Sequence, residues 1–235
     1  MIPNPFEGKL FVFEGIDGCG KTVQLKIAQE WIRKIRATPG RCHLVKPEKE
    51  PGKDRFWGQT IYKELSKPNG LHTTNLLGFQ SWYACDSREH MRKGTLRTLE
   101  VGGIVLMDRY RHSMVFGVPK LDSLGAREME IKRLLSLNLA ILGEYFILPD
   151  AAFIFDVSIP TALYRLQKKF EENGTGMFDE YEQTDKLELV RSNYQLFARI
   201  YPNCHLIDAE GSPEEVSKKV KEIIEPIMAP ITYTP

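Results

Sequence analysis

The residues with the clearest chemistry form one short loop near the start of the chain. Its sequence, GIDGCGKT, matches the pattern GxxxxGK[ST] in full, which average composition would produce in roughly one chain of this length per hundred. The loop consists of Gly15, Ile16, Asp17, Gly18, Cys19, Gly20, Lys21 and Thr22. Glycines let backbone N–H groups converge on phosphate oxygens, Lys21 can reach the β- and γ-phosphates, and the Thr22 hydroxyl can bind Mg²⁺. The pattern therefore predicts a loop that binds ATP and Mg²⁺ (a P-loop); the alternative is a glycine-rich turn that binds nothing.

A second candidate site follows the apolar run IVLMD, which ends at Asp108 and is followed by Arg109. In open α/β sheets the carboxyl ends of the strands face the ligand crevice. Asp108 is therefore predicted to hold Mg²⁺ through water, and Arg109 to bind the phosphate of an acceptor with its forked donors. The alternative for this pair is a salt bridge at the end of the strand.

The segments that must position these residues alternate between short apolar runs and helix-period stretches. The apolar runs are typical of strands covered on both faces and lie at residues 10–14, 42–46, 104–108, 151–157 and 204–209. Helical stretches begin after Lys21 and lie at residues 74–99, with a break near Gly94, and at 126–145, 160–170, 185–201 and 213–224. Ser158 and Ser212 are predicted to cap the two helices that open with a proline. The alternation predicts an α/β fold in which helices flank a five-stranded parallel sheet.

Composition limits the classes of function. The 235 residues fit one domain, 1–235. With 32 Lys and Arg against 31 Asp and Glu, the net charge of +1 argues against a general binder of nucleic acids or membrane surfaces. The four cysteines lack CxxC spacing, which indicates reduced thiols, and no apolar run approaches the ~18 residues of a membrane span. Because a secretory signal is also missing, we expect a cytoplasmic protein without nucleic-acid or membrane partners.

Six segments, in order along nearly the whole chain, resemble the thymidylate kinase family of P-loop nucleoside monophosphate kinases. FEGIDGCGKT at 13–22 resembles the family's FEGIDGxGKT, KEPG at 49–52 resembles REPG, and YACDSREH at 83–90 resembles YAxDRxEH. Asp108-Arg109-Tyr110 with Ser113 is similar to the DRYxxS signature, and the segments 149–165 and 206–209 complete the set. The resemblance implies a P-loop NTPase fold with a small lid, and Mg²⁺-dependent transfer of the ATP γ-phosphoryl group to dTMP, giving dTDP for dTTP biosynthesis.

The resemblance also implies roles for individual residues. Lys21 would act on the donor phosphates, Asp17 would accept a hydrogen bond from the 3′-hydroxyl of the acceptor, and Arg109 would bind the acceptor phosphate. Pro51, which follows a cis peptide bond in this family, would place Lys49 and Glu50 near the acceptor. The alternatives are a turn-stabilising role for Asp17 and a solvated charge run for Lys49 and Glu50.

The implied lid covers about residues 165–184 and includes a polar stretch, 171–184, that is predicted to be a mobile loop. Family members carry an arginine in the P-loop or supply basic residues from the lid. Since Cys19 occupies the variable P-loop position here, Arg165, together with Lys168 or Lys169, is predicted to stabilise the charge on the transferred phosphoryl group. The alternative for the two lysines is the solvated face of a helix.

Three departures from the family concern the base of the acceptor. The family arginine of YAxDRxEH falls on Ser87, and Arg88, a candidate substrate-binding residue, lies one position later, which rotates it by about 100° on a helix. After Ser113 the chain continues as MVFGV instead of with a polar residue. After KEPG, Phe56 or Trp57 could stack on a base, although a place in the core is favoured.

Three alternatives to a dTMP kinase stay open, and these departures suggest the first of them. They are a kinase of another deoxynucleotide or nucleoside, a nucleotide-binding regulatory protein without activity, and a nucleic-acid motor. A homodimer is implied by the resemblance alone.

Overall fold

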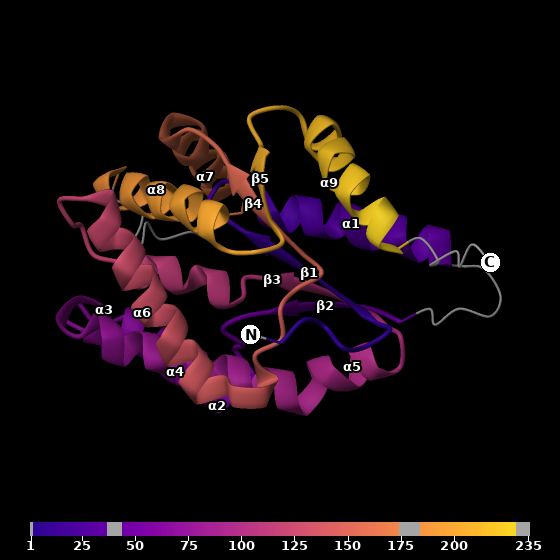
Figure 1. Ribbon diagram of the computed structural model, residues 1–235. Helices are drawn as coiled ribbons and strands as arrows, with labels where there is room; N and C mark the ends of the chain where they lie inside the picture. Colours follow the sequence, from indigo (N-terminus) through magenta and orange to yellow (C-terminus); the bar gives the residue numbers. More distant parts are fainter. Residues whose placement is uncertain (1, 37–43, 174–183, 229–235) are drawn as a thin grey trace.

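The computed structural model describes residues 2–36, 44–173 and 184–228, and within them the predicted α/β fold is confirmed (Figure 1). One parallel sheet has the strand order β2-β3-β1-β4-β5. The strands are β1 (Lys9–Glu14), β2 (Val45–Lys49), β3 (Ile104–Asp108), β4 (Ala151–Asp156) and β5 (Cys204–Asp208). β1 and β3 are neighbours, and their register pairs Phe13 with Asp108. The loops that follow these two strands therefore meet at the same edge of the sheet.

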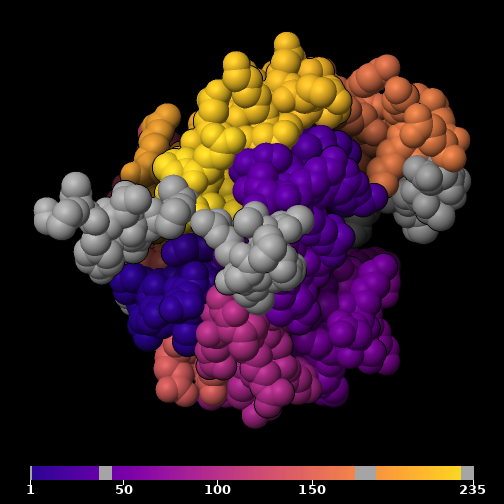
Figure 2. Space-filling view, turned by 90° about the vertical axis from the view of Figure 1, so that its right-hand side faces the viewer, coloured from indigo at the N-terminus to yellow at the C-terminus, as the bar shows by residue number. Residues whose placement is uncertain are grey.

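Helices cover both faces of the sheet (Figure 1). They are α1 (Lys21–Arg36), α2 (Phe56–Leu65), α3 (Leu71–Thr74), α4 (Leu76–His90), α5 (Leu96–Glu100), α6 (Leu124–Leu142), α7 (Ile159–Asn173), α8 (Thr184–Ile200) and α9 (Pro213–Met228). A π-helical turn, Met91–Thr95, joins α4 to α5, and two 3₁₀ helices cover Arg111–Gly117 and Gly143–Tyr145. α1 and α9 lie side by side at the surface, where Figure 2 shows α9 in yellow. Within these described elements, no helix is long and apolar enough to cross a membrane.

The central strand explains why helices are needed on both faces. Phe11 and Phe13 of β1 are fully buried in the larger apolar cluster, whereas the alternate residues Leu10 and Val12 are buried in a second cluster that includes Leu99 of α5. Successive side chains of a strand point to opposite faces, so both faces of β1 lie in a core. The continuous apolar run of the sequence corresponds to this two-sided burial.

The second strand differs from its prediction. It covers Val45–Lys49 instead of 42–46, and residues 42 and 43 lie outside the described residues. Its sequence, VKPEK, is not apolar, and it includes Pro47. A proline removes one donor from the ladder, which is tolerated at the edge of a sheet, and β2 is an edge strand.

Helix α2 was not predicted, because its short sequence gives no clear helical start. Its N-cap residue, Arg55, makes no side-chain cap hydrogen bond. The expected place of Phe56 in the core is wrong, since this side chain is 67% exposed. Trp57 lies against Trp82 of α4, with ring centroids 6.3 Å apart, and neither Phe56 nor Trp57 lines the cavities described below.

Two predicted helix signals are confirmed. Ser158 accepts a hydrogen bond from the Thr161 N–H at 3.4 Å, and Ser212 accepts one from the Glu215 N–H at 3.3 Å. The predicted break near Gly94 corresponds to the π-helical turn. Of the predicted lid, residues 165–173 belong to α7, Thr184 begins α8, and residues 174–183 lie outside the described residues.

Candidate active site

The loop between β1 and α1 encloses the ammonium group of Lys21. Lys21 is buried, and its Nζ donates hydrogen bonds to the carbonyl oxygens of Gly15 at 3.1 Å and Ile16 at 2.9 Å. Gly18 has a φ of +82°, and a Cβ atom there would lie 2.3 Å from the Ala162 carbonyl oxygen, so the loop packs tightly against α7. Thr22 is exposed at the start of α1. This strand–loop–helix arrangement is the setting that a phosphate-binding loop requires.

Asp17 connects the P-loop to the loop after β3. Its Oδ1 lies 2.5 Å from Arg109 Nη2 and 3.6 Å from Lys21 Nζ. Burial raises the pKa of the Asp17 carboxyl, but the charges of Arg109 and Lys21 outweigh it and hold the pKa below its usual value. The structure thus brings together three residues that the sequence placed in two separate motifs.

Cys19 lies inside the P-loop rather than on its surface. It is 1% exposed, and its Sγ is 3.8 Å from Lys21 Nζ. Burial raises the pKa of the thiol, so the position contributes no charge of its own. Cys19, Cys85 and Cys204 are free thiols, as predicted, and Cys42 lies outside the described residues.

Asp108, at the end of β3, is buried but not fully paired. Its Oδ1 has no hydrogen-bond partner among the described residues, and its Oδ2 lies 3.7 Å from Lys49 Nζ. A buried carboxylate oxygen without a partner is costly unless a ligand satisfies it. This oxygen therefore fits a cation held directly or through water.

A cavity of about 240 Å³ opens beside Asp17 and Arg109. Its lining also includes three further predicted residues, the charged Lys49 and Glu50 and the adjacent Pro51. The remaining wall is mostly aromatic and apolar and includes Tyr62, Leu65, Phe79, Tyr83 and Phe116. The guanidinium carbon of Arg109 lies 5.0 Å from the centroid of the Phe116 ring, and this contact helps to fix the arginine. A polar end near the P-loop and an aromatic end beyond it suit a phosphate joined to a base.

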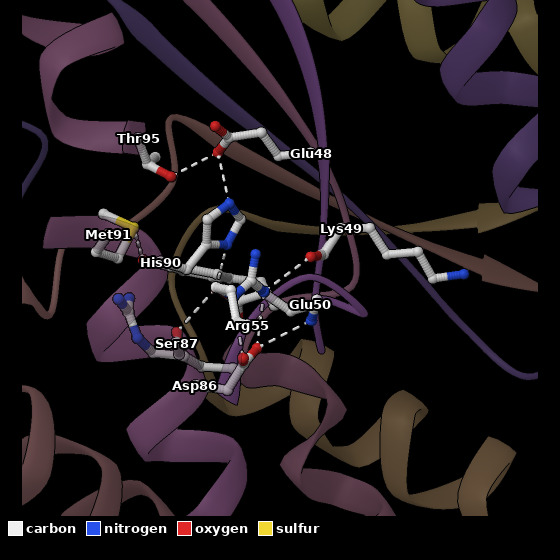
Figure 3. Close-up of polar contacts among 12 residues, drawn as sticks. Glu48, Lys49, Glu50, Arg55, Asp86, Ser87, His90, Met91 and Thr95 are labelled. Carbon is white, nitrogen blue, oxygen red and sulfur yellow. Dashed lines mark hydrogen bonds and ion pairs between the residues drawn. The ribbon is translucent and has the colours of Figure 1, made fainter. Parts of the chain in front are cut away.

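His90 of α4 holds the segment after β2 in place (Figure 3). Its Nε2 lies 3.1 Å from Glu48 Oε2, and its Nδ1 lies 3.0 Å from Glu50 Oε1. Burial lowers the pKa of His90, but the hydrogen bonds to both carboxylates outweigh it and raise the pKa to about 9. Burial likewise raises the pKa of Glu48, yet hydrogen bonds from His90, Lys46 and Thr95 lower it to about 2. A charged histidine between two carboxylates therefore fixes the Lys49–Glu50 backbone.

Asp86 of α4 provides a second anchor for the same segment (Figure 3). It accepts two hydrogen bonds from Arg55, at 2.9 Å from Nε and 2.7 Å from Nη2, and one from the Gly52 N–H at 3.2 Å. Arg55 also donates to the Lys49 carbonyl oxygen at 3.1 Å. The peptide bond between Glu50 and Pro51 is cis, as the resemblance implied. The cavity wall is therefore built from α4 as much as from β2.

Glu14 supports Arg109 from behind. It is fully buried, and it accepts hydrogen bonds from the Tyr110 N–H at 2.6 Å and from the hydroxyls of Ser113 and Tyr194, both at 2.8 Å. Burial raises the pKa of Glu14 to about 7, despite the charge of Arg109 and these hydrogen bonds, which lower it. The carboxyl group therefore fixes the turn that begins the 3₁₀ helix Arg111–Gly117.

Arg165 lies on α7, close to the P-loop. Its Nη2 donates to the carbonyl oxygens of Ala209 at 3.1 Å and Glu210 at 3.3 Å, and its Nη1 would lie 3.9 Å from a Cβ atom on Gly20. Lys168 is exposed and lies 4.0 Å from Glu172 on the same helix. Of the three basic residues predicted for the lid, Arg165 is the one that the described structure places beside the loop.

Arg88 and Ser87 lie on different sides of α4. The exposed Arg88 lies over the Tyr145 ring, 5.6 Å from its centroid, and does not line the cavity. The structure therefore does not bring Arg88 to the other predicted substrate-binding residues, because the one-residue shift turns it away from them. Ser87 is buried and donates to Glu50 Oε1 at 3.0 Å. Glu14, Arg55 and His90 have no predicted role, and the one sequence signal for any of them is a glutamate at the end of the apolar run LFVFE.

The part of the chain that is similar to known proteins includes every residue of this site. The sequence profile of the family described as "Thymidylate kinase" matches residues 13–220. A "Probable thymidylate kinase" of Pyrococcus abyssi is 28% identical over 222 residues, which cover 93% of this chain and 96% of that protein. A "Thymidylate kinase" of Caldicellulosiruptor saccharolyticus is 28% identical over 228 residues, covering 94% and 98%. One of Ureaplasma parvum serovar 3 is 29% identical over 221 residues, covering 92% and 89%.

Proposed function

Because the chain belongs to the thymidylate kinase family, we propose that it transfers the γ-phosphoryl group of ATP to dTMP, giving ADP and dTDP. One observation carries this proposal. Lys21 of the P-loop and Arg109 beside the cavity both lie next to Asp17 Oδ1, at 3.6 and 2.5 Å. A donor phosphate at Lys21 and an acceptor phosphate at Arg109 would therefore meet at this point, which is what direct transfer between two nucleotides requires.

Mg²⁺ fits the residues at the head of the site. The unpartnered Asp108 Oδ1 and the exposed Thr22 hydroxyl are oxygen ligands of the kind that Mg²⁺ prefers. The described part of the chain contains no group of three or more His, Cys, Asp or Glu that could hold a metal ion without help. Water and phosphate oxygens would complete the coordination, as is usual for Mg²⁺ with nucleotides. When bound, the ion neutralises charge on the donor phosphates.

Transfer forms one P–O bond and breaks another. An oxygen of the acceptor phosphate attacks the γ-phosphorus, while the bond from this phosphorus to the oxygen bridging to the β-phosphate breaks and ADP leaves. The attacking oxygen is already anionic, so no general base is needed, and positioning dominates. Lys21 stabilises negative charge on the donor side, and Arg109 orients the acceptor.

Arg165 is the basic residue of α7 that supports the same step. Its guanidinium group lies next to Gly20 and bears a positive charge at the edge of the P-loop, where Cys19 bears none. Cationic side chains stabilise the charge on the equatorial oxygens of the transition state. The contribution of Lys168 or Lys169, the homodimer and the cytoplasmic location stay predictions.

An assay that couples ADP release to a spectroscopic signal tests the proposal directly. The purified protein is given ATP, Mg²⁺ and, in turn, dTMP, dUMP, dCMP, dGMP, dAMP and thymidine. We expect turnover with dTMP well above the rate of ATP hydrolysis alone. No acceptor-dependent ADP release with dTMP would exclude the proposal, and turnover with thymidine alone would favour a nucleoside kinase.

A further inference from the structure

A single amide side chain lies deep in the acceptor cavity without a partner. Gln80 of α4 is 5% exposed and borders both the large cavity and a smaller one of about 30 Å³ behind it. Within the described residues its amide group makes no hydrogen bond. A glutamine amide can donate two hydrogen bonds and accept two, and the amide atoms of Gln80 are not among the fully enclosed polar atoms without a partner, so they are open to the cavity. The side chain is therefore a candidate contact for a bound ligand.

The backbone at Gly117 lies directly against this side chain. A Cβ atom on Gly117 would lie 2.5 Å from Gln80 Cγ and 2.9 Å from Gln80 Nε2. The amide thus packs directly against the backbone at the end of the 3₁₀ helix, at a position where any larger residue would displace it. Gly117 has no positive φ that would require glycine for backbone reasons, so the close approach itself explains the glycine.

The other polar residues that border both cavities already have partners. Glu50 accepts hydrogen bonds from Ser87 and His90 (Figure 3), Arg109 is paired with Asp17, and Ser113 donates to Glu14. Tyr83 also has an interaction within the protein. Among the described residues that border both cavities, Gln80 is therefore the polar side chain without a hydrogen bond, ion pair or ring contact inside the protein.

We propose that the Gln80 amide hydrogen-bonds the edge of the acceptor base, so that the site takes both 4-oxo and 4-amino pyrimidine nucleoside monophosphates. This inference rests on the proposed function. A thymine or uracil edge presents the O4 acceptor beside the N3–H donor, whereas a cytosine edge presents the N4 amino donor beside the N3 acceptor. A 180° rotation of the amide exchanges its donor and acceptor and matches either edge.

The position of Ser87 explains why discrimination is expected to be low. The family segment carries an arginine there, and a guanidinium group has donors and no acceptor, so it would favour a 4-oxo edge. Ser87 instead donates to Glu50, and the neighbouring Arg88 lies over Tyr145. In the described structure, α4 therefore places no side chain with donors alone where it would disfavour binding of a 4-amino base.

Steady-state kinetics with dUMP and dCMP test the proposal, because these acceptors differ only at the edge in question. For the wild-type protein we expect values of kcat/KM that differ by less than about tenfold. Gln80→Glu leaves only acceptors, so the dUMP:dCMP ratio of kcat/KM should fall by about tenfold or more. Gln80→Leu should raise KM for both acceptors about three- to tenfold, as loss of a neutral hydrogen bond does, with little change in their ratio.

Two further variants control for indirect effects. Gly117→Ala keeps the Gln80 amide group, but the added Cβ atom forces the side chain to move. This variant should therefore raise KM for both acceptors, as Gln80→Leu does. Gln59→Glu makes the same change of charge at an exposed position of α2 and should leave the dUMP:dCMP ratio unchanged. Circular dichroism of each variant identifies any that fails to fold.

The outcomes separate this inference from the proposed function. Turnover of dTMP together with an unchanged ratio in Gln80→Glu would overturn the inference and leave the kinase activity standing. A wild-type preference of a hundredfold or more for dUMP over dCMP would do the same. If no acceptor is phosphorylated, the proposed function fails, and calorimetric binding of dUMP and dCMP to the wild-type and Gln80→Glu proteins still decides the role of Gln80.

Discussion

Arg109 Nη2 lies 2.5 Å from Asp17 Oδ1 and joins the loop after β3 to the loop after β1. Arg109 has a φ of +64°, a left-handed conformation that is unusual for a residue with a side chain, and its N–H donates to the Phe13 carbonyl oxygen at 3.0 Å. Such conformations persist where the surroundings enforce them, often at functional sites. Here the enforced turn aims the guanidinium group at the P-loop.

Replacing Arg109 by lysine should impair the acceptor side of the reaction. Lysine keeps the charge but loses the planar fork that can hold both Asp17 and a phosphate. We expect kcat/KM for dTMP to fall by about 100-fold or more, whereas KM for ATP changes little. Steady-state kinetics with each substrate varied in turn measure both effects, and Arg133→Lys on the exposed face of α6 is the matched control. An equal rise of KM for ATP would place Arg109 on the donor side instead.

Lys21→Ala should abolish activity through the donor side. The buried ammonium group is the positive charge at the centre of the P-loop, and removal of one such group typically costs 10²–10³ in rate. We expect ATP binding, measured by calorimetry, and ADP release to be lost together. Lys26→Ala at an exposed position of α1 serves as the control. Binding of ATP with unchanged affinity by the Lys21→Ala variant would contradict the assignment.

Glu14 makes the stability of the protein fall as pH rises. Its pKa is raised from 4.5 to about 7 in the folded protein, so the folded state retains a proton that the unfolded state has lost. The resulting loss develops between about pH 4.5 and 7 and amounts to about 3 kcal/mol. Glu14→Gln mimics the protonated carboxyl group, so its stability relative to the wild type should increase over this range. Thermal unfolding at pH 5 and pH 8 measures the difference, and a gap that does not depend on pH would contradict it.

The protonation of His90 affects the stability of the protein over a higher pH range. Its pKa is raised from 6.5 to about 9, so its stabilising effect is fully present below about pH 6.5 and is lost as pH rises through 9. The wild type should therefore be more stable than His90→Gln at pH 6, by on the order of 3 kcal/mol more than at pH 10. Urea unfolding at the two pH values tests this. Because His90 holds Glu50, the variant should also raise KM for dTMP at pH 7.

The sequence predicted the parts of the site that depend on local order. The P-loop and the Asp108-Arg109 pair follow strands whose apolar runs are continuous, and a parallel sheet brings the ends of such strands to one edge. The spatial order of the strands places β1 beside β3, so the two motifs had to meet. The segment KEPG, by contrast, begins at the last residue of the edge strand β2, which is not apolar. The predicted strand, 42–46, therefore begins three residues before the observed one, Val45–Lys49.

The parts that could not be predicted depend on contacts between distant residues. Arg55 and Asp86 are 31 positions apart, and either one alone reads as a surface charge. His90, Glu48 and Glu50 likewise give no signal of their contact with one another. His90 can contact both carboxylates only because α4 crosses the segment after β2. Gln80 gave no signal in the sequence because a glutamine at that position of a helix is ordinary. Its significance comes from its burial and from the close approach of Gly117.

Helix α4 sets the distance between two residues of the candidate site, Gln80 and His90. Gln80 lies near its start and His90 at its end, and at a rise of about 1.5 Å per residue the two are roughly 15 Å apart along the axis. Gln80, near one end, borders the cavity beside the aromatic residues Phe79 and Tyr83, and His90, at the other end, holds Glu50 of the cavity wall. A substitution changes one contact, whereas insertion or deletion of a single residue between them would alter the length by about 1.5 Å and the direction by about 100°. The number of residues in α4 therefore sets the spacing between the Gln80 and His90 positions.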